Sequence, residues 1–400
     1  MNVIALTSLY RPHVGGVETM VEEMHTFLRQ ENHDLNVISK RWPENLSNEE
    51  IIDGVNIKRI KSPTNEEEMI SLAYEIRDKI SLLENGDILH MIGMRRPLPL
   101  FGVMLSHIHD KPVVGSIVGS EVPNKNSIES YKLWAEGAEY MPDAFRNTQS
   151  LSAVSESTKK FAIDSMPFLK NKIQVLPVGI DFDRYQNIEP KGIPGINEYI
   201  LTCRRLEPSK GIDIAIRAFH KTKIENDIKL PLVIAGEGSD KKRLVELCKK
   251  LDLDDNSVIF LGKVSLDESI GMLKTASMTI VPSIAEGGGL INTEANALGC
   301  PLITSSAGGI EEYTNRDSAI FTEPGNVDQV SSAILTVIKN DQKIDEMIKN
   351  GKEFAATMNW DKIIHSYIEW YEKAIETPKN RLRIHSAIGK KIFNILGNDI

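Results

Sequence analysis

Two glutamates, Glu286 and Glu294, flank a glycine-rich turn and have seven residues between them. The turn, Gly287-Gly288-Gly289, leads into a predicted helix, and the unpaired N–H groups at a helix start attract phosphate. An acid near such a start can accept hydrogen bonds from both hydroxyls of a ribose. Chance is the alternative for two acids alone, but with the turn and the strand before it they predict a phosphate and ribose site.

A second segment, Arg204–Gly211, places basic residues directly after a predicted strand and before a predicted helix. Cations at a strand end suit a diphosphate, which carries at least two negative charges. A solvated basic loop is the alternative interpretation of this stretch.

A third segment, Pro12–Glu18, contains Gly15 and Gly16 between a predicted strand and a predicted helix. Two glycines allow a ligand to approach the backbone closely. The segment is not G-x-G-x-x-G, so it lacks the fingerprint of nicotinamide cofactors. A tight turn that needs glycine explains it equally well.

The elements that would position these segments alternate between short β-branched runs and longer amphipathic stretches. The predicted strands are Val3–Thr7, Leu35–Ser39, Asp87–Ile92, Pro112–Val118, Leu151–Val154, Tyr199–Thr202, Leu232–Ala235, Ser257–Leu261, Met278–Val281 and Pro301–Thr304. The predicted helices are Val17–Gln30, Gly211–Lys221, Leu266–Thr275 and Gly289–Leu298. This alternation predicts an α/β fold with parallel sheets covered on both faces.

A Pro- and Gly-rich stretch at 187–195 interrupts the alternation and predicts a linker. We therefore expect two doubly wound, Rossmann-like domains, residues 1–190 and 191–360, followed by helices in residues 361–400. Ligands bind at the carboxyl ends of the strands in such sheets, so a cleft between the two domains is the expected site.

The bulk composition fits a globular protein of 400 residues and excludes several classes of function. A net charge of −9 argues against a nucleic-acid partner. The three cysteines, Cys203, Cys248 and Cys300, form no C-x-x-C pair, which fits a reducing cytosol better than a disulfide framework. We expect no leader and no membrane-spanning helix, because no apolar run is long enough.

With these pieces in place, the sequence resembles the retaining glycosyltransferases of family 4, which have the GT-B fold. The matching motifs follow the family order: P-x-x-G-G-x-E (Pro12–Glu18), S-E-S-T (Ser155–Thr158), V-L-P-V-G-I-D (Val175–Asp181), R-L-x-x-x-K-G (Arg205–Gly211), A-G-E-G (Ala235–Gly238), F-L-G (Phe260–Gly262), the two glutamates, and A-G-G-I-E-E (Ala307–Glu312).

The resemblance implies a role for each matching position. Arg205 and Lys210 would hold the donor diphosphate, and Glu286 a hydroxyl of the transferred sugar, which makes these three the catalytic set. Glu294 would bind the ribose. The remaining donor contacts would come from Gly15, Gly16, Lys263, Val264, Gly289, Leu290 and Ile291: the first two close over the donor, the next two contact the base, and the last three face the phosphates.

The resemblance also implies that no metal or other cofactor takes part, because cations and helix dipoles stabilise the leaving diphosphate. Two D-x-D strings, Asp181–Asp183 and Asp252–Asp254, lie away from the place a metal-using transferase would need. We interpret both strings as structural.

Two positions depart from the family pattern. Val118, in Val118-Gly119-Ser120-Glu121, stands where a histidine that contacts the donor sugar is expected. Its absence implies a different donor sugar, a shifted site, or reduced or lost activity. Gly288 replaces a common aromatic residue, which predicts added space or flexibility beside the sugar.

On the acceptor side we single out His90, Arg95 and Glu121 in the N-terminal domain. His90 is the nearest alternative to the missing histidine, or else a packed strand-end residue. Arg95 and Arg96 would meet a charged acceptor or simply cap a loop. The acceptor site is expected on loops at about residues 42–48, 94–100 and 122–145.

The last segment, Lys379–Ile400, forms an amphipathic pattern with Ile388, Ile392, Phe393 and Leu396 on its apolar side. It predicts either a helix that docks on the N-terminal domain, which we favour, or weak contact with a membrane surface. The resemblance leads us to expect the preceding helix, Trp360–Ile375, to cross back onto that domain.

We therefore expect a cytoplasmic glycosyltransferase, peripheral at the inner face of the membrane if the tail binds lipid. It would move a hexosyl or N-acetylhexosaminyl unit from a UDP-sugar, in preference to a GDP-sugar, to a hydroxyl of a glycan, a lipid-linked sugar or a small natural product. The alternatives are a non-catalytic sugar-nucleotide-binding partner of another transferase and a GT-B-like epimerase.

Overall fold

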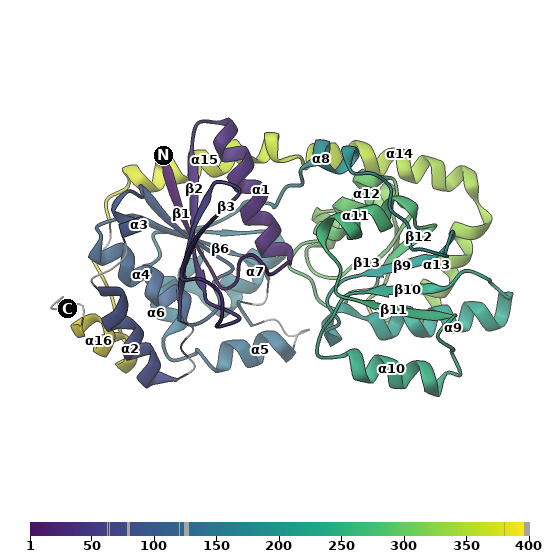
Figure 1. Ribbon diagram of the computed structural model, residues 1–400, viewed down its shortest axis with the longest axis horizontal. Helices are drawn as coiled ribbons and strands as arrows, with labels where there is room; N and C mark the ends of the chain where they lie inside the picture. The colour runs from purple at the N-terminus through teal and green to yellow at the C-terminus, as the bar shows by residue number, and fades with distance from the viewer. Residues whose placement is uncertain are drawn as a thin grey trace. The chain divides into compact units, whose positions relative to one another are not determined.

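The chain folds into two compact α/β units. A computed structural model describes residues 1–61, 63, 65–77, 81–119, 121–123, 128–379 and 381–395. The first unit comprises Met1–Val178 together with Trp360–Ile400, and the second comprises Gly179–Asn359. In each unit helices cover a twisted sheet (Figure 1). The chain thus leaves the first unit at Val178 and returns to it at Trp360, and the second unit begins ahead of the Pro- and Gly-rich stretch.

Within the described residues, the sheet of the first unit has eight strands in the order β3-β4-β2-β1-β5-β6-β7-β8. Only β3 and β4 pair antiparallel there; the other neighbours are parallel. The strands are β1 (Asn2–Thr7), β2 (Asp34–Lys40), β3 (Glu49–Ile52), β4 (Val55–Ile60), β5 (Ile88–Ile92), β6 (Val113–Ile117), β7 (Ser150–Ala153) and β8 (Ile173–Val175). The central strands β1, β5 and β6 are almost wholly buried, as expected for parallel strands with helices on both faces.

The helices of the first unit come from both ends of the chain. They are α1 (Gly16–Gln30), α2 (Glu66–Arg77), α3 (Ser81–Glu84), α4 (Leu98–Ile108), α5 (Ile128–Ala135), α6 (Met141–Asn147), α7 (Glu156–Ser165), the short η1 (Pro167–Leu169), α15 (Trp360–Glu376) and α16 (Ala387–Ile395). Of these, α4, α5 and α6 occupy much of the region where the sequence predicted acceptor loops, so that expectation was wrong for Leu98–Leu100 and for most of residues 128–145.

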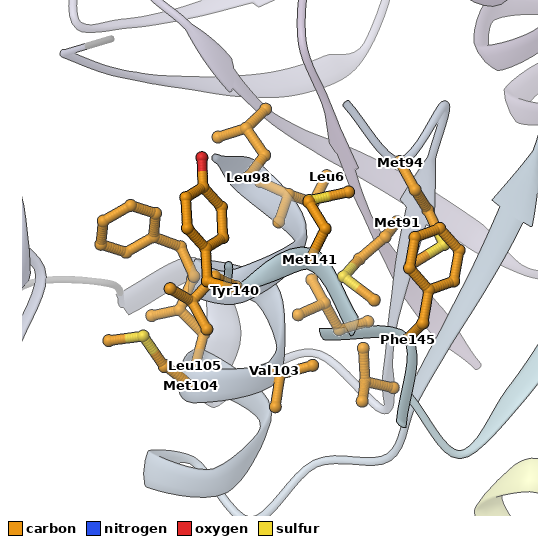
Figure 2. Packing of buried hydrophobic residues seen from close by; sticks show 14 of the residues in the cluster. Leu6, Met91, Met94, Leu98, Val103, Met104, Leu105, Tyr140, Met141 and Phe145 are labelled. Atoms are coloured by element: carbon orange, nitrogen blue, oxygen red, sulfur yellow. The ribbon is translucent and has the colours of Figure 1, made fainter. Parts of the chain in front are cut away.

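A cluster of methionine, leucine and aromatic side chains joins α4 and α6 to the sheet (Figure 2). Leu6 and Met91 reach it from β1 and β5, and Phe145 reaches it from α6. Gly102 makes the close approach possible: a Cβ there would lie 2.4 Å from Sδ of Met91. The cluster fixes α4 against the strands whose carboxyl ends carry the candidate acceptor residues.

The C-terminal helix α15 is attached to the first unit by polar contacts from its aromatic residues. Nε1 of Trp360 donates to Oε2 of Glu23 at 2.8 Å, and Nε1 of Trp370 donates to Oγ of Ser150 at 2.7 Å. Both indoles are buried. A buried indole N–H needs such a partner, so these bonds fix the orientation of the helix as well as its position.

The tail helix α16 docks on the same unit. Ile388, Ile392 and Phe393 are buried in the core cluster of that unit, and α16 packs along α2. The apolar face that a membrane-bound helix would present is therefore used internally in this structure, as the docking prediction requires. Leu396, predicted on the same face, lies outside the described residues.

The second unit has, within the described residues, six parallel strands in the order β11-β10-β9-β12-β13-β14. They are β9 (Ile200–Cys203), β10 (Leu232–Ala235), β11 (Val258–Gly262), β12 (Met278–Val281), β13 (Leu302–Ser305) and β14 (Ile320–Thr322). The helices are α8 (Phe182–Asn187), η2 (Pro208–Lys210), α9 (Ile212–Asn226), α10 (Lys241–Lys250), α11 (Leu266–Thr275), α12 (Leu290–Leu298), η3 (Ile310–Glu312), η4 (Arg316–Ser318), α13 (Val327–Lys339) and α14 (Asp341–Thr357).

No helix among the described residues is both long enough and apolar enough to cross a bilayer.

Candidate active site

The basic segment and the glycine-rich turn meet at the carboxyl end of the second sheet. They follow β9 and β12, which are neighbours in that sheet. The carbonyl of Ser209 accepts hydrogen bonds from the backbone N–H groups of Ile284 and Ala285, at 2.9 and 3.2 Å. Two segments about 75 positions apart in sequence are thereby held against each other, at the carboxyl ends of central parallel strands, where ligands bind in such sheets.

Three charged side chains gather where the two segments touch. Nη2 of Arg204 donates to Oε1 of Glu286 at 2.6 Å, and Nζ of Lys210 donates to Oε2 of the same carboxylate. The exposed fractions of the Arg204, Lys210 and Glu286 side chains are only 6%, 16% and 13%. One largely buried carboxylate is thus shared by two largely buried cations.

Burial and charge oppose each other in this cluster. Burial acts to raise the pKa of Glu286, but the positive charges of Lys210 and Arg204 outweigh it and lower that pKa, so the carboxylate is ionised. Burial lowers the pKa of Lys210 and of Arg204 from their ordinary values, while Glu286 counteracts this. The cluster therefore carries a concentrated positive charge that a further anion could share.

Glu294 lies in α12 and is 7% exposed. Its Oε1 accepts a hydrogen bond of 3.3 Å from the hydroxyl of Tyr185 in α8. Burial raises the pKa of Glu294 to about 7, and the bond from Tyr185 only partly opposes this. Both Glu294 and Arg204 act electrostatically on the Cys203 thiol at the end of β9, which places these two residues close to the same strand end.

Of the two adjacent arginines, the structure directs Arg204 into the cluster and leaves Arg205 exposed. Arg205 still acts electrostatically on Glu286, lowering its pKa, so its charge lies near the cluster although its side chain is exposed. The resemblance assigned the diphosphate to Arg205. In this structure the buried cation beside Lys210 is its neighbour, a residue that the motif pattern did not single out.

The remaining predicted donor residues of the second unit lie around the same strand ends. Gly289 is the N-cap of α12, and Leu290 and Ile291 form its first turn. Lys263 and Val264 directly follow β11, where the carbonyl of Gly262 accepts a bond of 2.7 Å from the N–H of Gly236. Lys263 is exposed and Val264 is half-buried.

The space predicted beside Gly288 is filled. A Cβ at Gly288 would lie 2.8 Å from Cε2 of Tyr313, a residue that follows η3 and is 1% exposed. The expectation of open space there is therefore wrong for this structure, while added flexibility stays a prediction. A tyrosine from a later loop contacts the backbone of the glycine turn instead.

The other predicted residues belong to the first unit. Gly15 is the N-cap of α1 and Gly16 is its first residue, so both lie between β1 and a helix start as predicted. Gly15 is extended, with φ −178°, and nothing lies within 4 Å of a Cβ built on Gly16. The absence of a side chain at Gly16 therefore leaves open space beside the N-terminus of α1.

His90 does not face an acceptor in this structure. It is fully buried in β5, and its Nδ1 and Nε2 lie 2.8 Å from Oη of Tyr371 and 2.7 Å from Oγ of Ser116. Burial lowers the pKa of His90 to about 3, so the ring is neutral. The acceptor role is withdrawn, and the alternative of a packed strand residue applies.

Glu121 and Arg95 lie at the carboxyl end of the first sheet. Glu121 is 4% exposed, and its Oε2 accepts a bond of 2.6 Å from the N–H of Gly119. Burial raises the pKa of Glu121, and the charge of Arg95 partly opposes the rise, so the two side chains are near each other. Val118 is half-buried next to them, while Ser120 lies outside the described residues.

The two D-x-D strings have structural roles. Oδ1 of Asp181 caps α8 by accepting a bond of 3.0 Å from the N–H of Arg184. Oδ1 of Asp254 accepts a bond of 2.8 Å from the N–H of Ser257 in a turn before β11. In the part of the chain that the structure describes, no group of three or more His, Cys, Asp or Glu side chains could hold a metal ion.

Comparison with known proteins identifies the family. The model of group 1 glycosyl transferases matches residues 183–354, and the model of glycosyltransferase family 4 matches residues 14–184. The chain belongs to the family 4 glycosyltransferases. The motifs that carried the resemblance thus lie inside two consecutive family matches.

Two relatives cover this glycosyltransferase from end to end. An uncharacterised glycosyltransferase of Methanocaldococcus jannaschii is 28% identical over 396 residues, which are 94% of this chain and 99% of the relative. A glycogen synthase of Mycobacterium tuberculosis is 24% identical over 412 residues, 96% of this chain and 98% of the relative. The crystal structure of Anabaena HepE in complex with UDP-glucose has 17% identity and a TM-score of 0.71, and covers 93% of this chain and 100% of that one. The fold is GT-B.

Two residues of the candidate site, Tyr185 and Tyr313, were not singled out from the sequence, and Arg204 was included in the basic segment without a role of its own. Arg204 carried a signal, since it adjoins the motif arginine at the end of a strand. Tyr185 and Tyr313 carried none, because they reach the site from elements whose packing local patterns do not encode.

Proposed function

We propose that this glycosyltransferase moves a hexosyl or N-acetylhexosaminyl unit from a UDP-sugar to a hydroxyl acceptor, without a metal ion and with retention of the anomeric configuration. The observation that carries the donor side is the largely buried pair of cations, Arg204 and Lys210, which contact Glu286 in the loop that leads into α12. A GT-B protein of similar fold has been crystallised with UDP and with UDP-glucose, which supports UDP as the nucleotide.

In this proposal, different residues of the second unit bind different parts of the donor. Lys210 and Arg204 bind the diphosphate and stabilise the negative charge that develops on it as the glycosidic bond breaks. Glu294 accepts hydrogen bonds from the ribose hydroxyls, and Glu286 accepts one from the transferred sugar. Two cations and a helix start can do for the leaving group what a metal ion does elsewhere, which is the physical support for metal independence.

The acceptor and the location are proposals of the same kind. The resemblance supports retention and a hydroxyl of a glycan, a lipid-linked sugar or a small natural product as the acceptor. We place the enzyme in the cytoplasm, a choice supported by its three unpaired cysteines. We do not propose a membrane contact for the tail, because the apolar face of α16 is buried in the first unit.

The test is a calorimetric screen of UDP, GDP and ADP in EDTA and then with added magnesium, followed by assay of UDP release from UDP-hexoses and UDP-N-acetylhexosamines. We expect UDP to bind and stabilise the protein in EDTA. The product's anomeric configuration, read by NMR, decides retention. A requirement for magnesium would overturn metal independence, and a preference for GDP would overturn the choice of base.

A pair of lysine variants tests the site itself. Lys210→Ala should weaken UDP binding and slow transfer at least about tenfold, since it removes a charge-assisted contact to the phosphates. Lys229→Ala is the matched control: Lys229 belongs to the same unit, is 80% exposed and pairs only with Asp227 among the described contacts. Equal turnover of both variants would show that Lys210 does not hold the diphosphate.

A further inference from the structure

Glu286 lies in the structure between two cations that a donor diphosphate would also need. Its two carboxylate oxygens are each engaged, Oε1 by Arg204 and Oε2 by Lys210. A carboxylate in this position resembles a bound anion: it carries one negative charge, and its oxygens accept from the same donors that phosphate oxygens would use.

Arg204 has hydrogen-bond donors that Glu286 does not use. Its Nε and Nη1 are buried, and neither has a hydrogen-bond partner among the described residues. A buried guanidinium N–H without a partner is unfavourable, because the group has lost water and gained nothing in return. The planar fork of an arginine matches the paired oxygens of a phosphate, so an anion larger than a carboxylate would satisfy more of it.

The backbone that carries these side chains is held firmly. The carbonyl of Glu286 accepts a bond of 3.3 Å from the N–H of Gly309, and Gly308 packs so closely that a Cβ there would lie 2.0 Å from that carbonyl oxygen. Gly211, after Lys210, has φ +66° and packs equally closely against the carbonyl of Pro282. An exchange of partners in this cluster therefore has to occur through side-chain movement.

We propose that Glu286 occupies an anion position of the donor diphosphate in the ligand-free enzyme, and that Arg204 is the arginine that passes from this carboxylate to the diphosphate. This inference rests on the proposed nucleoside-diphosphate donor. When the donor binds, its phosphate oxygens take over Arg204 and Lys210, and the released carboxylate of Glu286 turns to a hydroxyl of the sugar. The bare nucleotide offers no such hydroxyl.

The exchange makes Glu286 a residue that discriminates the donor from the spent nucleotide. A sugar nucleotide gives Glu286 a new partner for the two that it loses, whereas UDP alone displaces the carboxylate and leaves it buried without a donor. The ligand-free ion cluster thus competes against the product more strongly than against the substrate. The consequence is faster clearance of UDP after transfer.

The experiment measures the affinities of UDP and UDP-glucose in EDTA by titration calorimetry for the wild type, Glu286→Gln and Arg204→Met. The matched controls are Glu246→Gln and Arg217→Met, on exposed positions of α10 and α9 in the same unit. We expect E286Q to bind UDP about tenfold more tightly than the wild type and R204M about tenfold more weakly, with both controls within about twofold. The preference for UDP-glucose over UDP should fall in E286Q.

The outcomes separate this inference from the proposal beneath it. A wild type that binds none of UDP, GDP and ADP overturns the proposed donor and this inference with it. A wild type that binds UDP while E286Q binds it equally or more weakly leaves the donor class standing and overturns the inference. If R204M fails to fold, Arg204→Lys decides instead: it keeps a charge for Glu286 but loses the fork, so UDP should bind several-fold more weakly.

Discussion

The hydroxyl of Tyr185 lies 3.3 Å from Oε1 of Glu294 and joins α8, the first helix of the second unit, to α12. Both side chains are buried, and the 0% exposure of Tyr185 leaves the carboxylate little access to water on that side. This environment, rather than a neighbouring acid, raises the pKa of Glu294 to about 7. A carboxyl group proposed to bind ribose is thus close to its titration point near neutral pH.

The raised pKa of Glu294 predicts a stability that falls with pH. The folded protein holds a proton that the unfolded chain releases near pH 4.5, so this stabilisation is complete below that value and is lost as pH rises through about 7. The full loss corresponds to about 3 kcal/mol in the free energy of unfolding. Glu294→Gln cannot ionise, so its stability relative to the wild type should increase between pH 5 and pH 8.

Calorimetry can follow this difference in the second unit alone. All four tryptophans belong to the first unit: Trp42, Trp134, Trp360 and Trp370. A calorimetric transition that occurs without a change in tryptophan fluorescence therefore reports the unfolding of the second unit. Glu246→Gln, an exposed change in the same unit, is the control for loss of a charge. If the stability of the second unit changed equally with pH in the wild type and in E294Q between pH 5 and pH 8, Glu294 would ionise normally.

The lowered pKa of His90 predicts the opposite pH dependence for the stability of the first unit. Burial lowers its pKa to about 3, whereas an unfolded histidine titrates near 6.5. The stability that follows from this is present above pH 6.5 and is lost as pH falls toward 3, by about 3 kcal/mol at pH 4.5. His90→Gln should be less stable than the wild type at pH 7.5 but should lose less on acidification.

Tryptophan fluorescence measures this directly, because the ring of Trp370 lies 5.3 Å from that of His90. Urea unfolding at pH 7.5 and pH 4.5 gives the two free energies for each protein. His365→Gln, an exposed change on α15, is the control for loss of a histidine elsewhere in the unit. Equal losses in the wild type and H90Q would mean that His90 becomes protonated in the folded protein.

The strands of the second unit were largely predictable, and the reason is local. β10, β12 and α11 have the predicted bounds because each is a compact apolar or amphipathic run between clear breakers. The hairpin of β3 and β4 was missed, since β3 is half-exposed and both strands mix charged with apolar residues. Its signal was the pair Asp53-Gly54, whose φ values of 51° and 84° suit a two-residue hairpin turn.

The site was predictable in its motifs but less so in its contacts. Sequence spacing cannot decide which of Arg204 and Arg205 turns inward, because one residue of shift at a strand end reverses the direction of the side chain. His90 has the type and position of an acceptor residue, yet α15 returns from the far end of the chain and covers it with Tyr371. The error at His90 comes from a contact distant in sequence, whereas the assignment of the diphosphate to Arg205 stays a prediction.

The hydrogen bonds of Asp143 predict that this residue anchors the C-terminal tail to the first unit. Its buried carboxylate on α6 accepts bonds from the backbone N–H groups of His385 and Ser386, at 2.8–3.1 Å, and from the hydroxyl of Ser386 at 2.7 Å. Asp143→Ala removes all of these and should lower the free energy of unfolding of the first unit by about 3 kcal/mol. Arg381 and Arg383 are already exposed, but release of the backbone that follows them should make the chain there cleavable by trypsin, as gel analysis of a timed digest would show.

The matched control for the tail is Asp110→Ala. Asp110 also binds the tail, through Lys379 at 2.8 Å, but its side chain is 95% exposed. An exposed ion pair contributes about 0–1 kcal/mol, so D110A should keep the tail resistant to trypsin. If D143A and D110A were digested alike, the Asp143 contacts would not be what anchors α16.

Alanine substitutions at Gly308 and Gly325 can separate the effect of backbone strain from the effect of displacing Glu286. Both have positive φ, +59° and +83°, so an alanine at either position costs about 1 kcal/mol in backbone strain. Only at Gly308 would the added Cβ strike a backbone atom, the carbonyl oxygen of Glu286 at 2.0 Å; at Gly325 its nearest neighbour is Cδ1 of Ile284 at 3.8 Å. Gly308→Ala must therefore move the segment that carries Glu286, whereas Gly325→Ala need not. We expect G325A to bind UDP as the wild type does. We expect G308A to bind it at least about tenfold more weakly, because the displaced segment also carries the glycine turn and the start of α12 that would face the phosphates, with a larger fall in the calorimetric transition of the second unit. If titration calorimetry gave both variants the same UDP affinity, the position of the Glu286 segment would not matter for the nucleotide. The donor site would then have to be sought elsewhere along the carboxyl ends of these strands.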